Sequence, residues 1–290
     1  MRFRKIYLEI TNLCNRSCSF CPGTSRPPRS LSLAELEALL PKLRPYTDFL
    51  YFHLMGEPLF HPELEAFALR AADYGFRLIL TTNGTLLPEK LPALLRMPAL
   101  HKVNVSLHSF EANDTGASKE EYLEGCVALG RIPFQSSETS EMSPESHRSF
   151  IVCYRLWNEG GADCLNSDIE KTLRCAFPGE WHRDRSGIRL AERTYLQYGE
   201  KFDWPDEAAE DGGPVGFCYG LRDQLGVLSD GTVVPCCLDN NGTLALGNLF
   251  TQSMEEILDS PRAKAIYAGF SERKAVESLC RRCGYARRFH

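Results

Sequence analysis

The stretch Glu9–Gly23, EITNLCNRSCSFCPG, places three cysteines within eight residues. Cys14, Cys18 and Cys21 have the spacing C-x3-C-x2-C and follow an apolar run, which puts them on the loop after the first expected strand. In a parallel α/β sheet the carboxyl ends of the strands carry the active site. Three thiolates at this spacing can bind three corners of a 4Fe-4S cluster and leave the fourth iron open to a small molecule.

A zinc site and ordinary core cysteines are the alternatives for this stretch. Zinc sites usually combine C-x2-C with two further ligands at set distances, whereas His53 and His61 lie on other expected elements. The spacing therefore favours an iron-sulfur site over zinc.

Short apolar runs alternate with helical patterns through the first two hundred residues. Ser32 and Glu35 form a capping-box pattern ahead of one helix, and others are expected from Pro62 to Gly75, after Pro88, over 119–130 and over 167–177. This alternation predicts a parallel sheet with right-handed crossovers, and six βα units suit a partial barrel better than a closed eight-stranded one. The expected strands span 5–10, 48–54, 77–82, 102–107, 149–156 and 187–199.

Length and composition indicate a globular α/β domain with a smaller appendage. The chain has 290 residues, of which 43% are hydrophobic and 24% charged, and its net charge of -5 gives no general attraction to nucleic acid. No signal peptide or membrane-spanning run is visible, so a cytoplasmic location without a membrane partner is expected. Twelve cysteines in such a chain should be reduced thiols or metal ligands.

Two segments interrupt the pattern. The acidic stretch 202–216, FDWPDEAAEDGGPVG, predicts a linker between a barrel domain of residues 1–201 and a small α+β domain of residues 217–290. The serine-rich stretch 133–149 predicts a mobile connection.

The cysteine motif is similar to the signature of the radical SAM superfamily, C-x3-C-x-aromatic-C, with Phe20 as the aromatic residue. The resemblance implies a partial (βα)6 barrel whose cluster binds the amino and carboxylate groups of S-adenosylmethionine. It further implies that one electron from the cluster splits this cofactor into methionine and a 5'-deoxyadenosyl radical, which abstracts a substrate hydrogen. A one-electron donor such as flavodoxin or ferredoxin is the implied partner.

Other positions match the family in order. The sequence MGEP at 55–58 resembles the GGEP motif, so Gly56 and Glu57 are expected beside the methionine amino group, with Met55 in place of the first glycine. Without the resemblance, the same residues would predict only a strand-ending turn. Arg155 ends the fifth expected strand and could bind the cofactor carboxylate as a fork. His53, in mid-strand, is expected to be buried and hydrogen-bonded.

The fourth expected strand has a polar face, which is unusual inside a parallel α/β sheet. Asn104, Ser106 and His108 alternate with apolar residues, so this face is expected to line a wet or ligand-filled cavity. The resemblance makes Ser106 and His108 contacts of cofactor or substrate, and Asn83 ends the third expected strand in the same way. A satisfied polar core is the alternative.

A second set of cysteines follows the linker: Cys218, Cys236, Cys280 and Cys283. Four thiolates can fill every ligand position of a 4Fe-4S cluster or of a tetrahedral zinc. The pattern C-x12-G-x4-C with a distant C-x2-C is similar to the auxiliary-cluster module of SPASM and twitch radical SAM enzymes. That resemblance implies one auxiliary 4Fe-4S cluster in a shortened module, with electron transfer as its role and structural zinc as the alternative.

Two further positions near this set stay open in the sequence. Cys237 could replace Cys236 as the ligand. Asp239 is a speculative substrate base, although a surface carboxylate is the simpler expectation.

The sequence therefore predicts a radical SAM oxidoreductase, or an enzyme that modifies peptides or natural products. Cys14 comes early for a leader-recognition domain, which favours a small molecule, or a peptide or protein delivered by a separate partner. A non-catalytic iron-sulfur electron carrier or redox sensor is the competing hypothesis. An incompletely ligated cluster is also expected to be sensitive to oxygen.

Overall fold

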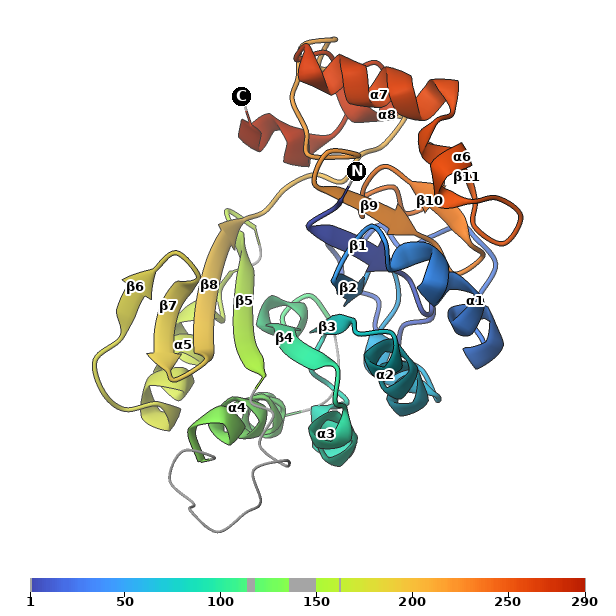
Figure 1. Ribbon diagram of the computed structural model, residues 1–290. Coiled ribbons are helices and arrows are strands. Elements are labelled where there is room, and N and C mark those ends of the chain that lie inside the picture. Colours follow the sequence, from blue (N-terminus) through green and yellow to red (C-terminus); the bar gives the residue numbers. More distant parts are fainter. Residues whose placement is uncertain (1, 114–117, 136–149, 162, 290) are drawn as a thin grey trace.

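One mixed sheet organises the computed structural model, which describes residues 2–113, 118–135, 150–161 and 163–289 (Figure 1). Its eleven strands lie in the order β11-β10-β9-β1-β2-β3-β4-β5-β8-β7-β6. The strands are β1 (Lys5–Leu8), β2 (Phe49–Phe52), β3 (Arg77–Thr82), β4 (Leu100–Ser106), β5 (Ile151–Glu159), β6 (His182–Asp184), β7 (Gly187–Ala191), β8 (Thr194–Glu200), β9 (Gln224–Val227), β10 (Thr232–Val234) and β11 (Gly247–Asn248).

Six strands form the predicted partial barrel. β1, β2, β3, β4, β5 and β8 pair in this order and every pairing is parallel. The predicted sixth strand over 187–199 was wrong in one respect, because this segment is an antiparallel hairpin of β7 and β8. Arg193, at a φ of 56°, forms the tight turn between the two strands, so that only β8 continues the barrel.

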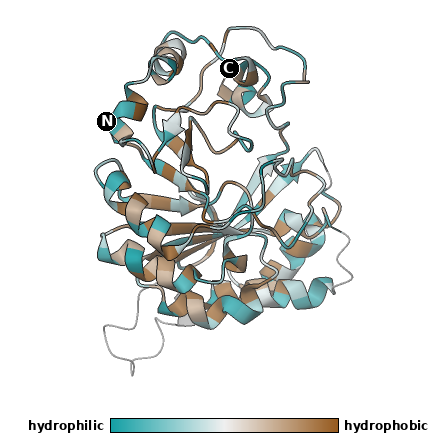
Figure 2. Ribbon diagram, turned by 90° about the vertical axis from the view of Figure 1, so that its right-hand side faces the viewer, coloured by the Kyte–Doolittle hydropathy of each residue, from teal (hydrophilic) through white to brown (hydrophobic). Residues whose placement is uncertain are grey.

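The helices cover the outer side of these strands (Figures 1 and 2). The capping box before α1 is confirmed, since the Glu35 amide donates to Ser32 Oγ at 3.3 Å and the Ser32 amide donates to Glu35 Oε2 at 2.8 Å. The helices are α1 (Leu33–Leu43), α2 (Leu64–Asp73), α3 (Leu87–Arg96), α4 (Lys119–Gln135), α5 (Asn166–Ala176), α6 (Met254–Leu258), α7 (Pro261–Ser271) and α8 (Ser278–Arg281), with short 3-10 turns η1 (Pro58–Phe60), η2 (Leu107–Ser109) and η3 (Gly284–Phe289).

The main core lies between the sheet and these helices, and the other face of β4 is polar. Val103 and Val105 of β4 are fully buried in the core. Because side chains alternate along a strand, the intervening Lys102, Asn104 and Ser106 lie on the inner face of the barrel. The polar face that the sequence predicted is therefore turned toward the barrel interior.

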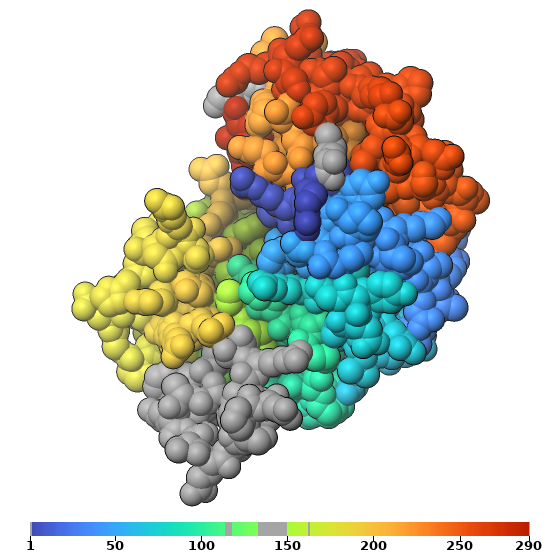
Figure 3. Space-filling view, in the orientation of Figure 1, coloured from blue at the N-terminus to red at the C-terminus, as the bar shows by residue number. Residues whose placement is uncertain are grey.

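The C-terminal part of the chain extends the barrel sheet. β9 pairs in parallel with β1, and β10 and β11 follow as antiparallel strands, so residues 224–248 continue the sheet beyond its first strand. Helices α6, α7 and α8 lie over this extension, in red at the top of Figure 1, and the space-filling view shows the same part of the chain stacked above the barrel (Figure 3). The linker expected at 202–216 has neither helix nor strand, and Asp211 in it pairs with Arg281 at 2.9 Å.

The sequence predicted a mobile connection over the serine-rich stretch 133–149. Most of this stretch lies outside the described residues. None of the helices within the described ranges has the length and apolar character that crossing a membrane requires.

A close approach between α4 and β5 generates the first prediction. A Cβ added at Gly130 would lie 2.1 Å from Tyr154 Oη, and this hydroxyl donates to the Cys126 carbonyl at 2.8 Å. Gly130→Ala should lower the free energy of unfolding by about 1–3 kcal/mol through overpacking. In a Tyr154→Phe background, which lacks the clashing oxygen, urea unfolding should show a smaller cost for the same substitution. Equal costs in both backgrounds would contradict this packing.

Candidate active site and cluster sites

The three-cysteine loop runs from β1 to α1 at the carboxyl end of the first strand. Cys14 and Cys21 are exposed and Cys18 is half-buried. Asn113 Nδ2 donates to Cys18 Sγ at 3.0 Å, and Asn83 Nδ2 lies 3.9 Å from Cys14 Sγ. Hydrogen bonds to cysteine sulfur tune the potential of an iron-sulfur cluster. Asn83 was expected as a contact of cofactor or substrate, but nothing in the sequence marked Asn113, which lies ninety-five positions from its partner.

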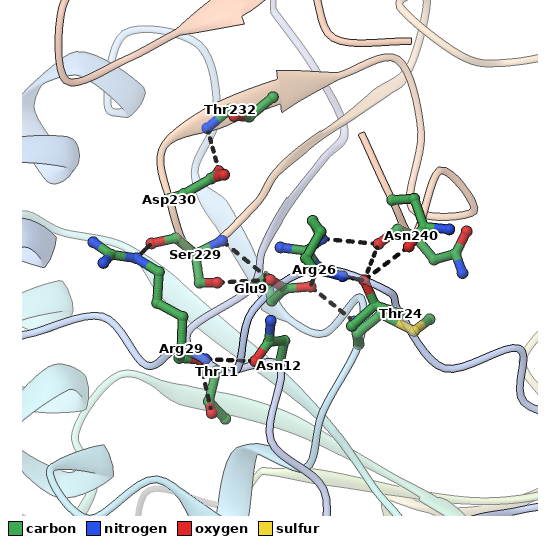
Figure 4. A network of polar contacts seen from close by, with 12 residues as sticks. Glu9, Thr11, Asn12, Thr24, Arg26, Arg29, Ser229, Asp230, Thr232 and Asn240 are labelled. Atoms are coloured by element: carbon green, nitrogen blue, oxygen red, sulfur yellow. Dashed lines mark hydrogen bonds and ion pairs between the residues drawn. The ribbon is translucent and has the colours of Figure 1, made fainter. Parts of the chain in front are cut away.

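A buried carboxylate fixes this loop to the rest of the molecule (Figure 4). Glu9 has a fully buried side chain, and Arg26 Nη2 approaches its Oε2 at 2.6 Å. Its Oε1 accepts from the Ser229 amide at 3.1 Å and from Ser229 Oγ at 2.9 Å, while the Met55 amide lies 3.3 Å from its Oε2. One carboxylate thus joins the loop, the turn after β2 and the turn between β9 and β10.

Further hydrogen bonds connect the same loop to the C-terminal segment (Figure 4). The carbonyl of Asn240 accepts from Thr24 Oγ1 and from Arg26 Nε, each at 3.0 Å. Asn240 Nδ2 in turn donates to the Gly23 carbonyl at 2.6 Å. Residues 23–29 are therefore held by residues 229–241, a link that sequence reasoning missed because it joins polar residues about two hundred positions apart.

The Gly-Glu-Pro turn packs directly against the backbone before the first cysteine. Gly56 has a φ of 77°, and a Cβ there would lie 2.3 Å from the Thr11 carbonyl oxygen and 2.8 Å from that of Leu13. The Glu57 amide donates to the Leu13 carbonyl at 2.8 Å. Only glycine fits at position 56, so the turn holds Glu57 beside the three-cysteine loop.

The carboxylate of Glu57 is buried and hydrogen-bonded. The backbone N–H of Asn83 donates to Glu57 Oε2 at 2.7 Å, and the backbone N–H of Leu59 donates to Glu57 Oε1 at 3.0 Å. Burial raises the pKa of Glu57 to about 7, although these hydrogen bonds act in the opposite direction. Asn83 itself bridges to the loop, because its Nδ2 donates to Asn15 Oδ1 at 2.9 Å.

Phe20 and His108 connect the loop to the end of β4. Their rings pack with centroids 4.9 Å apart, and a His108 ring nitrogen lies 3.0 Å from the Arg155 carbonyl oxygen. Burial lowers the pKa of His108. Ser106 lies opposite Arg155 in the register of β4 and β5, so the structure brings these four predicted residues to one end of the barrel.

Arg155 and His53 lie on the inner face of the strands. The Arg155 guanidinium carbon is 4.3 Å from the centroid of the Trp157 ring, and its Nε is buried without a hydrogen-bond partner. Burial lowers the pKa of His53 to about 4. His53 packs 5.9 Å from the Tyr7 ring and is half-buried, and its expected hydrogen bond stays a prediction.

The four cysteines of the second set line one pocket. Cys218 follows the linker, Cys236 follows β10, Cys280 lies on α8 and Cys283 comes just after it. Burial raises the pKa of the Cys218 thiol to about 11. Apolar side chains complete the pocket wall, among them Leu238, Leu244, Phe270 and Leu279.

Cys237 points away from this pocket. Its thiol hydrogen-bonds to Tyr7, and it packs beside Tyr51 against a small apolar cluster that includes Leu54 and Val234. The structure therefore places Cys236 among the other three cysteines of the pocket, and Cys237 against β1.

Asp239 lines the same pocket but is not the surface carboxylate that the sequence predicted. It is 1% exposed, and its two carboxylate oxygens accept from the amides of Thr243 at 2.9 Å and Leu244 at 2.8 Å. Burial raises the pKa of Asp239. These contacts close the loop of residues 239–244, and a role as substrate base stays a prediction.

Comparison with models of protein families identifies two domains in this chain. Residues 8–137 match the model of the radical SAM superfamily, and residues 218–284 match SPASM, an iron-sulfur cluster-binding domain. Residues 8–137 are thus a radical SAM domain, and residues 218–284 are a SPASM domain. These two domains imply a 4Fe-4S cluster with S-adenosylmethionine in the barrel and an auxiliary iron-sulfur cluster in the C-terminal part.

Curated radical SAM relatives match parts of this chain. An AdoMet-dependent heme synthase of Methanosarcina barkeri (strain Fusaro / DSM 804) is 27% identical over 168 residues, which are 55% of this chain and 48% of the relative. The S-adenosyl-L-methionine-dependent 2-deoxy-scyllo-inosamine dehydrogenase of Niallia circulans is 29% identical over 114 residues, 37% of this chain and 46% of the relative. The match thus spans less than half the length of each of these relatives.

Solved structures share the fold. BtrN in complex with AdoMet and 2-DOIA has a TM-score of 0.58 at 18% identity, over 98% of this chain and 93% of that one. A tagged form of anSMEcpe with bound AdoMet has a TM-score of 0.62 at 15% identity, over 97% of this chain and 85% of that one. The partial barrel and its C-terminal part therefore form a fold that these structures share over nearly the whole of this chain.

The ion pair of Glu9 and Arg26 generates a prediction about stability. Arg26→Met leaves a buried carboxylate without its cation and should lower the free energy of unfolding by about 3 kcal/mol or more. The matched control is Arg70→Met, because Arg70 pairs with Glu37 at 2.7 Å on the surface, where such pairs contribute about 1 kcal/mol or less. Urea unfolding of the reduced, cluster-free protein measures both, and equal losses would contradict the account.

Glu57 generates a prediction about pH. Its folded pKa of about 7 exceeds the value of about 4.3 for an unfolded glutamate, so its contribution to stability is complete below about pH 4 and is lost as the pH rises through about 7. Glu57→Gln removes this dependence. As the pH rises from 5 to 8, the free energy of unfolding of the wild type should fall by about 2–3 kcal/mol relative to that of the variant. If urea unfolding gives the wild type and Glu57→Gln the same pH dependence of stability, the pKa of Glu57 is not raised.

Proposed function

We propose that this protein is an enzyme that cleaves S-adenosylmethionine reductively at a 4Fe-4S cluster held by Cys14, Cys18 and Cys21, and abstracts a hydrogen from its substrate. The observation that carries the proposal is the loop itself. It offers three thiols, at least partly exposed, with an asparagine amide beside Cys18, and the Gly-Glu-Pro turn lies against its backbone. The donor set fits three corners of a cluster and leaves one iron for the cofactor.

The residues around the loop have distinct proposed roles. Gly56 and Glu57 bind the cofactor amino group, since the turn presents backbone oxygens and a carboxylate that is charged above about pH 7. Phe20, Asn83, Ser106 and His108 form the wall of the cofactor site, where the packed rings exclude water. When bound, the cluster and S-adenosylmethionine supply a 5'-deoxyadenosyl radical.

The second site is proposed to hold the auxiliary 4Fe-4S cluster on Cys218, Cys236, Cys280 and Cys283. These four thiols line one pocket. Four thiolates can fill all four corners of a 4Fe-4S cluster, and the match of residues 218–284 to an iron-sulfur cluster-binding domain favours the cluster over a structural zinc. Full ligation leaves no iron for a substrate, which supports a role in electron transfer.

The substrate is proposed to be a small molecule or a peptide that enters the barrel, and the electrons to come from a flavodoxin or ferredoxin. Both substrate classes occur among structures of this fold, because the BtrN complex contains 2-DOIA and an anSMEcpe complex contains a peptide. An electron carrier or redox sensor would need neither the Gly-Glu-Pro turn nor a polar barrel interior.

Formation of 5'-deoxyadenosine tests this function. The protein is reconstituted anaerobically with iron and sulfide and reduced with dithionite, and chromatography with mass spectrometry follows the product from S-adenosylmethionine. Replacing Cys14, Cys18 and Cys21 together by alanine should abolish the product, because the open cluster is lost. Cys164→Ala with Cys175→Ala, at two exposed cysteines outside both groups, is the control and should retain it. Product from the triple variant would refute the proposal.

A further inference from the structure

Two cations lie on neighbouring strands of the inner barrel face. In the register of β4 and β5, Asn104 lies opposite Cys153 and Ser106 opposite Arg155. Lys102 lies two residues before Asn104 and therefore shares the same face. Lys102 and Arg155 thus both extend into the interior, on the side away from the helices.

Neither cation has a carboxylate partner among the described residues. The Nε–H of Arg155 is buried without an acceptor, while its guanidinium stacks on Trp157. Glu9 carries a carboxylate at the end of the same sheet face, but Arg26 and Ser229 occupy it. A buried cation without an anion is costly, and proteins normally pair such groups.

The titratable groups around Arg155 come from several elements, and none of them is a carboxylate. Burial lowers the pKa of Lys102, and Arg155 and Lys5 act in the same direction. The groups close enough to respond to the charge of Arg155 are Tyr7 on β1, Tyr51 on β2, His53 just after β2, Lys102 on β4, His108 on η2, Cys153 on β5 and Tyr285 on η3. The surroundings of Arg155 thus hold a second cation, aromatic and imidazole rings and a thiol, without a carboxylate.

A second polar group on this face also lacks a partner. Asn104 is 1% exposed, and its Nδ2 donates to the Leu80 carbonyl at 3.2 Å, whereas its Oδ1 has no donor. A buried acceptor of this kind fits a hydrogen-bond donor on a ligand. The inner face of β4 and β5 thus offers two cations for an anion and a free acceptor for a hydrogen-bond donor.

We propose that Arg155 and Lys102 bind an oxyanion of the substrate, a carboxylate or a phosphate, with Asn104 accepting from a neighbouring hydroxyl or amino group. The planar guanidinium can present its free Nε–H together with an Nη–H to the two oxygens of such a group as a fork. This inference rests on the proposed function and gives Arg155 a different ligand from the cofactor carboxylate that the family resemblance implied.

Anion-dependent stability of the reconstituted protein tests the site. Calorimetry under anaerobic conditions compares acetate and phosphate, each at about 50 mM, with chloride at equal ionic strength. Acetate, phosphate or both should raise the Tm of the wild type by about 2 °C, and which of them acts identifies the oxyanion. Arg155→Gln and Lys102→Met should lose this increment and unfold at or above the wild-type temperature in chloride, because each removes an unpaired cation. Arg70→Gln, on the surface, should keep the increment.

Equilibrium dialysis with labelled S-adenosylmethionine separates this inference from the proposed function. Arg155→Gln should bind the cofactor within about twofold of the wild type, and a loss of more than about tenfold would assign the anion to the cofactor and overturn the inference. The absence of any acetate or phosphate increment in the wild type, or its persistence in both variants, would overturn it as well. If the wild type forms no 5'-deoxyadenosine, the proposed function fails. A rise in Tm with acetate or phosphate that is lost in the variants would still show an anion site.

Discussion

The buried carboxylate of Glu9 is the contact on which both cluster sites depend. It lies just after β1 and binds Arg26 of the three-cysteine loop and Ser229 of the C-terminal segment at the same time. A buried ion pair is stable only when its remaining lone pairs are satisfied, and here the Ser229 hydroxyl and two backbone amides satisfy them. The position of the first cysteines is thus fixed by residues that belong to the second half of the chain.

This contact gives the two sites a fixed spatial relation. β9 pairs with β1 along its whole length, so the sheet itself connects the barrel to the pocket of four cysteines. Cys237 follows the pocket residue Cys236 directly and touches Tyr7 of β1, on the inner side of the barrel. The proposed electron transfer from the barrel to the auxiliary site would pass this contact between Tyr7 and Cys237. Such a path suits the division between one open cluster and one closed cluster.

Residue patterns predicted the parts of this structure that depend on local spacing. The three-cysteine motif, the capping box at Ser32 and the alternation of strands and helices are all visible over short windows. Contacts between distant segments were not predictable, because Glu9 and Asn113 are ordinary polar residues until the fold brings Ser229 and Cys18 to them. The burial of Asp239 was missed for the same reason, and the β7–β8 hairpin was missed because Arg193 adopts a positive φ that its residue type does not favour.

The central claim is that one group of cysteines builds an open cluster and the other a closed one. Electron paramagnetic resonance of the dithionite-reduced protein, recorded with and without S-adenosylmethionine, tests it most directly. We predict that the cofactor changes the signal that remains when Cys218, Cys236, Cys280 and Cys283 are replaced by alanine, and leaves unchanged the signal that remains when Cys14, Cys18 and Cys21 are replaced. A cofactor-dependent change in the second protein, or a first protein without a cluster signal, would contradict the account.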